Sequence, residues 1–353
     1  MRTLLTLLLL ACAAPATTAP AAPPATRDAP AANWLRLASE HFDMLTSAPE
    51  PDSTQLLVEL EQFHAFFLRI IPQPSARDPR RLVFVFDNND KEQFIRHLPR
   101  SPAGRPSRSA GVHLPGAPQP LIIMQPNPAS RANIYRAYGR SLVTARFEKL
   151  PPWLHESLAD VLQSFTANAD TITLDDNTRK MRFQVMRTLP LLPLDTLFAT
   201  ESNDPRLKEH DNARQYFSES WILLYYATLA QDNAPYTLEN FLRFATTSRE
   251  TTSTTPAAAT AQAFAKIFNT DYAPLETILA AIIRAGDIHA RAITIPAQPI
   301  REKITCRPVT VEEIETALAA LSARNAATVP TPPKKTKHPQ TAPKPPAPPP
   351  SDF

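Results

Sequence analysis

Residues 150–159 read LPPWLHESLA, and this stretch decides how the middle of the chain folds. Proline fits the first turn of a helix but not its interior, so Pro151 and Pro152 separate two helical segments. We expect one helix over residues 132–147 and the next over residues 153–165. The proline pair therefore predicts two consecutive helices in the middle of the chain.

The part of the chain before this helix pair is predicted to form a small sheet with helices. Its clearest strand is the run LVFVF, whose apolar residues are typical of a strand buried on both faces. The elements expected here are an extended segment at 34–46, helices at 56–67 and 91–97, and strands at 82–86, 111–114 and 121–124, the last two forming a hairpin.

The part after the helix pair is predicted to be mainly helical. A long irregular region comes first, and helices then follow at 215–230, 238–246, 257–268 and 275–285. The Thr- and Ala-rich segment 247–260 is interpreted as a loop insertion. A capping box of Thr310 and Glu313 predicts one more helix near the end. A sheet followed by helices favours the α+β class.

The two ends of the chain are interpreted as processing and linker segments. Arg2 and the following leucine-rich run are too short to span a bilayer and predict a signal peptide. Cleavage after small residues or lipidation of Cys12 both remain open, so a membrane contact is expected only through such a lipid anchor. Residues 13–32 and the proline-rich tail from 327 to 353 lack the apolar residues of a core.

Charge and cysteine content exclude several classes of protein. The formal net charge of +3 arises mostly from lysines of the tail, so the body is close to neutral and nucleic-acid binding is not expected. Cys306 is the only cysteine after Cys12, which excludes a framework of disulfides in the body.

The order of these elements and motifs resembles the peptidase MA-like family of gluzincins, which are secreted or envelope zinc metallopeptidases with a zincin fold. The resemblance covers roughly residues 33–284, and its most specific piece is PWLHESLA. Family members typically carry P-x-W-L-N-E-G-x-A there, with the Glu as the third zinc ligand. Glu156 takes that position, whereas His155 departs from the usual Asn.

The resemblance implies a zincin-like α+β fold, with a small N-terminal mixed sheet followed by a mainly helical C-terminal half. It also implies export to the periplasm, the envelope or the medium. The expected organisation is a signal peptide at 1–12, a linker at 13–32, a peptidase MA-like domain at 33–286, a C-terminal extension with one helix at 287–326, and a tail rich in proline and lysine at 327–353.

The residues that bind and activate zinc in this family are missing. The preceding helix of the family carries H-E-x-x-H, in which two histidines hold the metal and the Glu takes a proton from the bound water. With Tyr138 aligned to the tyrosine that often follows the Glu, this chain reads Arg136-Ala137-Tyr138-Gly139-Arg140. Arginine has no lone pair for a metal, and alanine accepts no proton. No metal and no catalytic residue are therefore expected.

The chain's histidines form no HxxxH pair, and His155 and Glu156 lie about 100° apart on a helix, which is a poor arrangement for one metal.

Three functions remain open. The first function is a catalytically inactive metallopeptidase-like protein, a pseudopeptidase, that binds an unknown peptide or protein partner in the remnant cleft. The second is a zinc metallopeptidase with non-standard ligands. The third is a structural envelope module.

A charge argument suggests what replaced the metal. Zinc with two neutral histidines and one glutamate carries one positive charge, and so do two arginines facing the same glutamate. Arg136 and Arg140 are therefore expected to clamp Glu156 from the neighbouring helix, with Tyr138 and His155 nearby. If the clamp is buried, breaking it should cost about 3–5 kcal/mol.

Overall fold

The computed structural model describes residues 30–327, apart from 72–78, 101–104, 106, 117–118, 148, 175, 231, 254, 289 and 291. The predicted signal peptide with Cys12, most of the linker, and the tail after residue 327 lie outside the described residues. None of the described helices is both long and apolar enough to cross a membrane.

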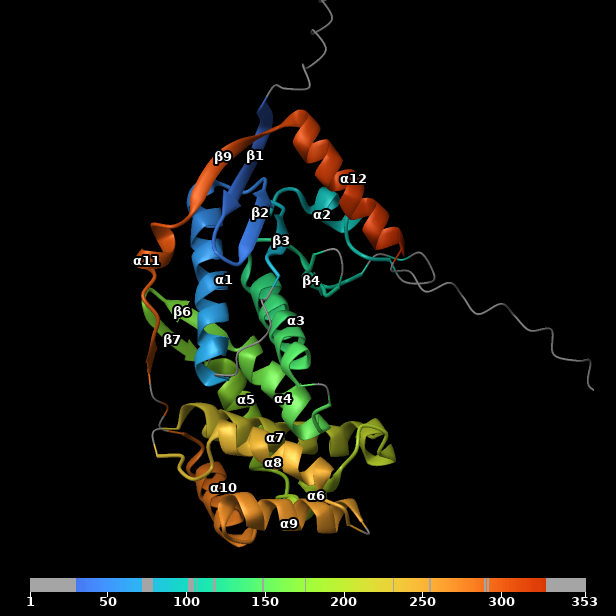
Figure 1. Ribbon diagram of the computed structural model, residues 1–353, viewed down its shortest axis with the longest axis vertical. Coiled ribbons are helices and arrows are strands. Elements are labelled where there is room, and N and C mark those ends of the chain that lie inside the picture. The colour runs from blue at the N-terminus through green and yellow to red at the C-terminus, as the bar shows by residue number, and fades with distance from the viewer. Residues whose placement is uncertain are drawn as a thin grey trace, which may run out of the picture.

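A six-stranded mixed sheet forms the upper part of the molecule (Figure 1). Its order is β4-β5-β3-β2-β1-β9, with β2, β3 and β5 parallel to one another and β4, β1 and β9 antiparallel to their neighbours. The strands are β1 (Pro30–Ala38), β2 (Phe42–Thr46), β3 (Arg81–Val85), β4 (Gly111–Leu114), β5 (Leu121–Met124) and β9 (Thr305–Thr310).

Helices cover both faces of this sheet, which explains why its central strands are largely apolar. Val83 and Val85 face the core shared with α1 (Glu50–Ile70) and α3 (Pro128–Arg146). Phe84 faces the opposite side, where α2 (Lys91–Arg96) and α12 (Val311–Ala327) close a smaller core. The last helix thus packs on the sheet formed by the first half of the chain, as Figure 1 shows.

The lower part of the molecule is helical and begins with α4 (Pro152–Gln163), which packs against α3. The remaining described elements of the chain, in chain order, are β6 (Phe165–Asn168), β7 (Thr171–Leu174), α5 (Asp176–Met186), α6 (Leu194–Ala199), a 3-10 helix η1 (Pro205–Lys208), α7 (His210–Leu229), α8 (Leu238–Glu250), α9 (Pro256–Phe268), α10 (Ala273–Ala285), β8 (Ile293–Thr294) and α11 (Gln298–Arg301). Of these, α11 lies beside α1 (Figure 1). The predicted α+β class, with a small mixed sheet first and helices after it, is confirmed.

Two parts of the sequence prediction are wrong. The region predicted as irregular contains the β6–β7 hairpin, α5 and α6, and the predicted loop insertion is mostly helix, since α8 runs to Glu250 and α9 starts at Pro256. The hairpin turns at Ala169 with a left-handed backbone, without the glycine that normally marks such a turn. In α8 the hydroxyls of Thr246 and Ser248 donate to carbonyls four residues back, so these polar groups find partners within the helix.

Segment 287–326, predicted as an extension, contributes to both sheets. β8 pairs with β7, and β9 pairs with β1 along the edge of the large sheet. The predicted cap of α12 is present, because the backbone N–H of Glu313 donates to Thr310 Oγ1 at 3.2 Å.

Candidate functional site

The two helices predicted to carry the chemistry lie against each other at close range. Asn127 caps α3 by accepting from the backbone N–H of Ser130, and Pro152 starts α4. A methyl group added at Gly139 of α3 would lie 2.7 Å from Cδ1 of Leu162 on α4. The missing side chain at Gly139 therefore brings the polar faces of α3 and α4 within reach of each other.

Arg136 and Arg140 both contact Glu156 across this helix pair. They lie one turn apart on α3, so their side chains leave the same face. Nη2 of Arg140 donates to Oε2 of Glu156, and Nη2 of Arg136 lies 3.5 Å from the same oxygen. The structure thus brings together the three residues that the sequence predicted to meet across the two helices.

These contacts are more open to solvent than a buried clamp would be. The side chains of Arg136, Arg140 and Glu156 are 37%, 39% and 30% exposed. Water screens such pairs, and their contribution to stability is about 1 kcal/mol or less. The cost of about 3–5 kcal/mol expected for breaking a buried clamp therefore does not apply to these partly exposed contacts.

Asp160 and Arg182 extend the network beyond what the sequence predicted. Nε of Arg136 lies 2.5 Å from one carboxylate oxygen of Asp160, and Nη2 of Arg182 lies 3.1 Å from the other. Asp160 follows Glu156 by four residues on α4, so both carboxylates share one face. That spacing was visible in the sequence, whereas Arg182 comes from α5 in the region predicted as irregular.

His155 supports Glu156 from the same helix. Its Nδ1 lies 3.2 Å from Oε1 of Glu156, and its Nε2 lies 3.0 Å from the hydroxyl of Thr144 on α3. The hydrogen bond with His155, together with the charges of Arg140 and Arg136, holds the pKa of Glu156 below its usual value against the effect of burial. Glu156 is therefore a carboxylate at neutral pH.

Tyr138, predicted near the clamp, lies on the opposite side of α3. Residues two apart on a helix point about 200° from each other, so Tyr138 cannot share a face with Arg136. It is fully buried, its hydroxyl lies 2.6 Å from Nδ1 of His64 on α1, and the guanidinium of Arg81 lies 4.4 Å from its ring centre. Tyr138 belongs to the packing between helices and sheet.

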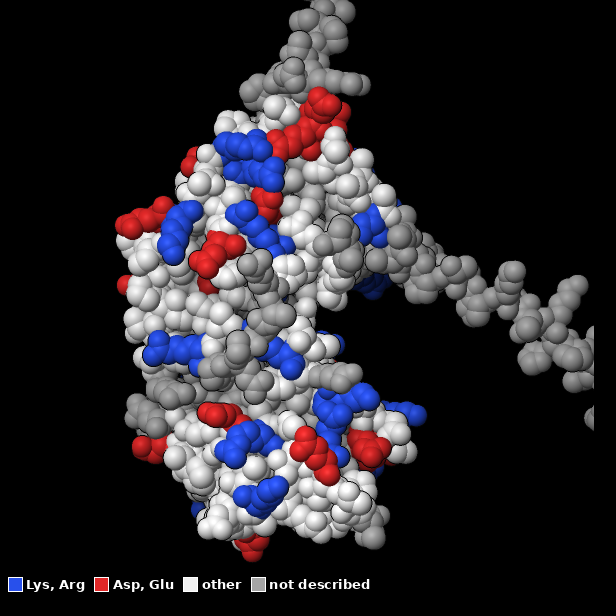
Figure 2. Space-filling view, in the orientation of Figure 1, with Lys and Arg blue, Asp and Glu red and all other residues white. Residues whose placement is uncertain are grey.

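A groove of about 630 Å³ separates α3 from strand β4. Gly111, Val112 and His113 line it from the strand, and Arg136, Ala137 and Arg140 line it from the helix. Figure 2 shows the molecule hollowed on its right side, beside the region that Figure 1 labels α3 and β4, with lysine and arginine side chains on the lower edge. Arg136, Ala137 and Arg140 thus face a groove that is open to solvent.

The strand that borders this groove is the edge of the sheet, and no described strand pairs with its outer side. The N–H of Phe86 donates to the C=O of Met124, so the backbone groups of Met124 point toward β3. Successive residues of a strand alternate, so the backbone N–H and C=O of the adjacent Ile123 point toward β4, where Val112 lies opposite. The next residue of β4, His113, therefore directs its N–H and C=O away from the sheet.

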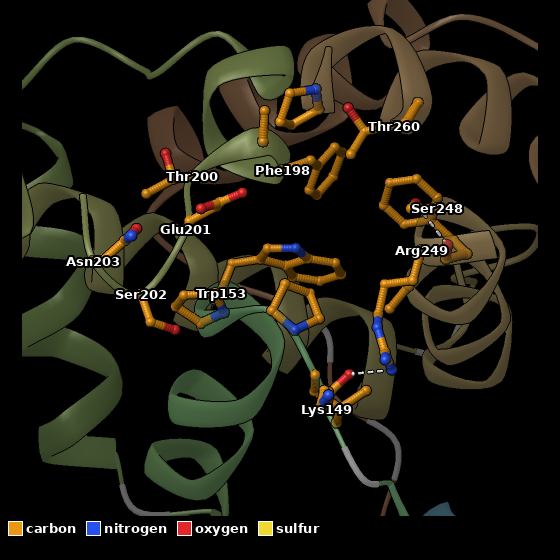
Figure 3. A pocket seen from close by; sticks show the side chains of 18 residues that line it. Lys149, Trp153, Phe198, Thr200, Glu201, Ser202, Asn203, Ser248, Arg249 and Thr260 are labelled. Atoms are coloured by element: carbon orange, nitrogen blue, oxygen red, sulfur yellow. Dashed lines mark hydrogen bonds between the residues drawn. The ribbon is translucent and has the colours of Figure 1, made fainter. Parts of the chain in front are cut away.

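A second cavity, of about 500 Å³, lies at the start of α4, between α6, α8 and α9 (Figure 3). Trp153, Phe198 and Phe244 pack against one another there, with ring centres 4.9 to 6.0 Å apart. At the rim, Arg249 donates to the carbonyl of Lys149 at 2.9 Å, as the dashed line in Figure 3 shows. Because the three rings are almost fully buried, we attribute this cavity to core packing of the helical part.

The side chains of Arg136, Ala137 and Arg140 do not suit zinc. Arg136 and Arg140 present only N–H donors to Glu156, and Ala137 between them has no group that accepts a proton. Within the described part of the chain, no three His, Cys, Asp or Glu side chains form a group that could hold a metal ion.

Comparisons with known proteins do not assign the chain to a family. No protein-family model matches it, and a search of curated proteins also returns no match.

Proposed function

We propose that this is an exported, catalytically inactive relative of zincin-type metallopeptidases, which binds an extended peptide in the groove between β4 and α3. The observation that carries the proposal is the outer side of β4, with which no described strand pairs, beside a groove whose opposite wall holds Arg136 and Arg140. An extended peptide can add to such an edge as a further strand, with main-chain hydrogen bonds supplying affinity.

The loss of catalysis follows from the side chains at three positions. Hydrolysis of this type needs a metal-bound water and a base to take its proton. Arg136, Ala137 and Arg140 supply neither. The contacts of both arginines with Glu156 support the alignment of residues 136–140 with the zinc-binding helix of the gluzincins, since the resemblance requires this helix and Glu156 to meet.

Strand addition can be tested with labelled peptides. A library of short, strand-forming peptides is screened by fluorescence anisotropy against the full chain, and the best binder is resynthesised with N-methyl groups at alternate residues. We expect one N-methyl pattern to abolish binding and the other to preserve it, because only alternate residues face β4. Equal binding of both patterns would contradict strand addition.

The role of the helix wall is tested by Arg140→Ala, with Arg243→Ala as the matched control. Arg243 is an exposed arginine on α8 and does not line the groove. We expect Arg140→Ala to weaken peptide binding about tenfold, roughly the loss of one charge-assisted hydrogen bond, and the control to leave it unchanged. One zinc per chain that survives dialysis, together with peptide hydrolysis abolished by a chelator, would instead support a peptidase with unusual ligands.

A further inference from the structure

A smaller cavity of about 320 Å³ adjoins the groove through a shared residue. Arg136 lines both, and the smaller cavity lies between α4, α5 and α7. Its other charged walls are Glu156 and Asp160 from α4, Arg182 from α5 and Arg214 from α7. A ligand in the groove therefore has a charged cavity beside it.

This cavity has more positive than negative charge. Glu156 already accepts from Arg136 and Arg140, and Asp160 already accepts from Arg136 and Arg182. Arg214 adds another guanidinium, and no ion pair joins it to a described residue. The three arginines and two carboxylates that line the cavity leave one positive charge uncompensated. His210, also on the wall, is 87% exposed, and its Nδ1 lies 3.3 Å from a carboxylate oxygen of Asp211.

One of the positive charges in this cavity, that of Arg182, belongs to a largely buried side chain. Its side chain is 19% exposed, and its Nε is buried without a hydrogen-bond partner in the described structure. Burial lowers the pKa of Arg182, and repulsion from Arg136 adds to this effect while Asp160 opposes it. A buried donor without a partner is unfavourable by about 1–3 kcal/mol.

We propose that this cavity receives a carboxylate of the bound peptide, so that the groove selects acidic peptides. The inference rests on the proposed function, because the carboxylate arrives on the peptide that lies along β4. Guanidinium groups suit a carboxylate because their paired N–H donors match its two oxygens. Arg136 lines both the groove and the smaller cavity. A peptide side chain that extends from the groove into the cavity therefore reaches Arg136 first, and Arg182 and Arg214 lie beyond it.

The test compares two peptides that differ in one residue. Starting from the best binder found for the groove, each position is replaced in turn by Glu and by Gln, and affinities are measured by anisotropy for the full chain. We expect one position at which Glu binds at least tenfold more tightly than Gln. In Arg214→Gln this preference should fall to about threefold or less, whereas Arg243→Gln should retain it.

Arg214 is suited to this test because it is exposed and forms no ion pair with a described residue, so its replacement should leave the fold intact. Arg182→Gln serves as a second variant, compared only after its melting curve matches that of the wild type. If Glu and Gln peptides bind equally at every position, the inference fails while the proposed function stands. If Arg243→Gln removes the preference as fully as Arg214→Gln, general charge attraction explains it and the inference also fails. If no peptide binds at all, the proposed function itself is wrong.

Discussion

Glu156 accepts from Arg136 and Arg140 across the contact between α3 and α4. A zinc ion would hold its ligands by coordination, whereas the guanidinium groups hold Glu156 through hydrogen bonds that water can reach. The arginines can therefore connect α3 and α4, but they contribute less rigidity than a metal would.

We predict that Glu156→Ala lowers the free energy of unfolding by about 1 kcal/mol, or the melting temperature by about 2–4 °C. The folded-state pKa of Glu156 lies below its unfolded value, so its contribution is present above the unfolded pKa and is lost as the pH falls through the folded one. Melting curves of wild type and variant should thus differ at pH 7 and converge below about pH 4. Glu315→Ala, at an exposed position of α12, is the control; a pH-independent difference for Glu156→Ala would contradict the charge argument.

The side chain of Glu219 should change stability with pH in the opposite direction to Glu156. Burial raises the pKa of Glu219 on α7 to about 7, although the backbone N–H of Leu192 donates to it at 2.9 Å. The folded state therefore binds more protons than the unfolded state between about pH 4.5 and 7, so this group makes stability fall as the pH rises through that window. Glu219→Gln should be more stable than wild type at pH 8 and not at pH 4.5, as urea unfolding would show. If the order is the same at both pH values, Glu219 is not the buried acid that the structure indicates.

At the residue scale, the sequence predicted only what helical spacing determines. Arg136, Arg140 and Glu156 could be paired because one turn separates the arginines and the proline pair separates their helices. Arg182 could not be included, since its contact with Asp160 depends on where α5 lies in space. Tyr138 was misplaced because a match to the family motif was given more weight than its angular position on the helix.

At the scale of elements, the contact between α3 and α4 depends on one residue without a side chain. Gly139 costs helix stability relative to alanine, yet an added methyl group would meet the fully buried Leu162. We predict that Gly139→Ala is destabilising by about 1 kcal/mol, because crowding at the helix contact outweighs the gain in helix propensity. Chemical denaturation measures the effect.

A double-mutant cycle separates crowding from other causes. Leu162→Ala alone leaves a cavity and destabilises the protein. Added to Leu162→Ala, the Gly139→Ala change should be clearly less destabilising, since the contact at 2.7 Å with Cδ1 is gone and only the contact at 3.2 Å with Cβ of residue 162 remains. An additive cycle would show that Gly139 and Leu162 do not limit the approach of the helices.

Elements with a clear apolar period were predicted well, and elements held by long-range contacts were not. The apolar stripe of α1 and the valine and phenylalanine run of β3 needed no knowledge of the fold. Strand β9 has an exposed, polar sequence, and its pairing with β1 joins segments about 270 residues apart. Its place in the sheet therefore could not be read from local pattern.

At the scale of the whole molecule, the first and last described strands pair at one edge of the sheet. β9 pairs with β1, and α12 covers the sheet face that contains Trp34 and Phe86. Arg324 near the end of α12 also donates to the carbonyl of Leu114 on β4, at the opposite edge. The segment predicted as an extension thus spans the sheet from one edge to the other.

This arrangement predicts how truncation will act. A chain that stops after residue 286 loses β8, β9 and α12, which exposes the apolar side of the sheet and an unpaired edge on β1. We expect it to be insoluble or to unfold without a cooperative transition, whereas a chain that stops after residue 327 should melt like the full protein. Expression yield and calorimetry of both truncations distinguish these outcomes. Cooperative melting of the shorter chain near the wild-type temperature would show that residues 33–286 fold independently, and that the last helix and strand are an appendage to the sheet.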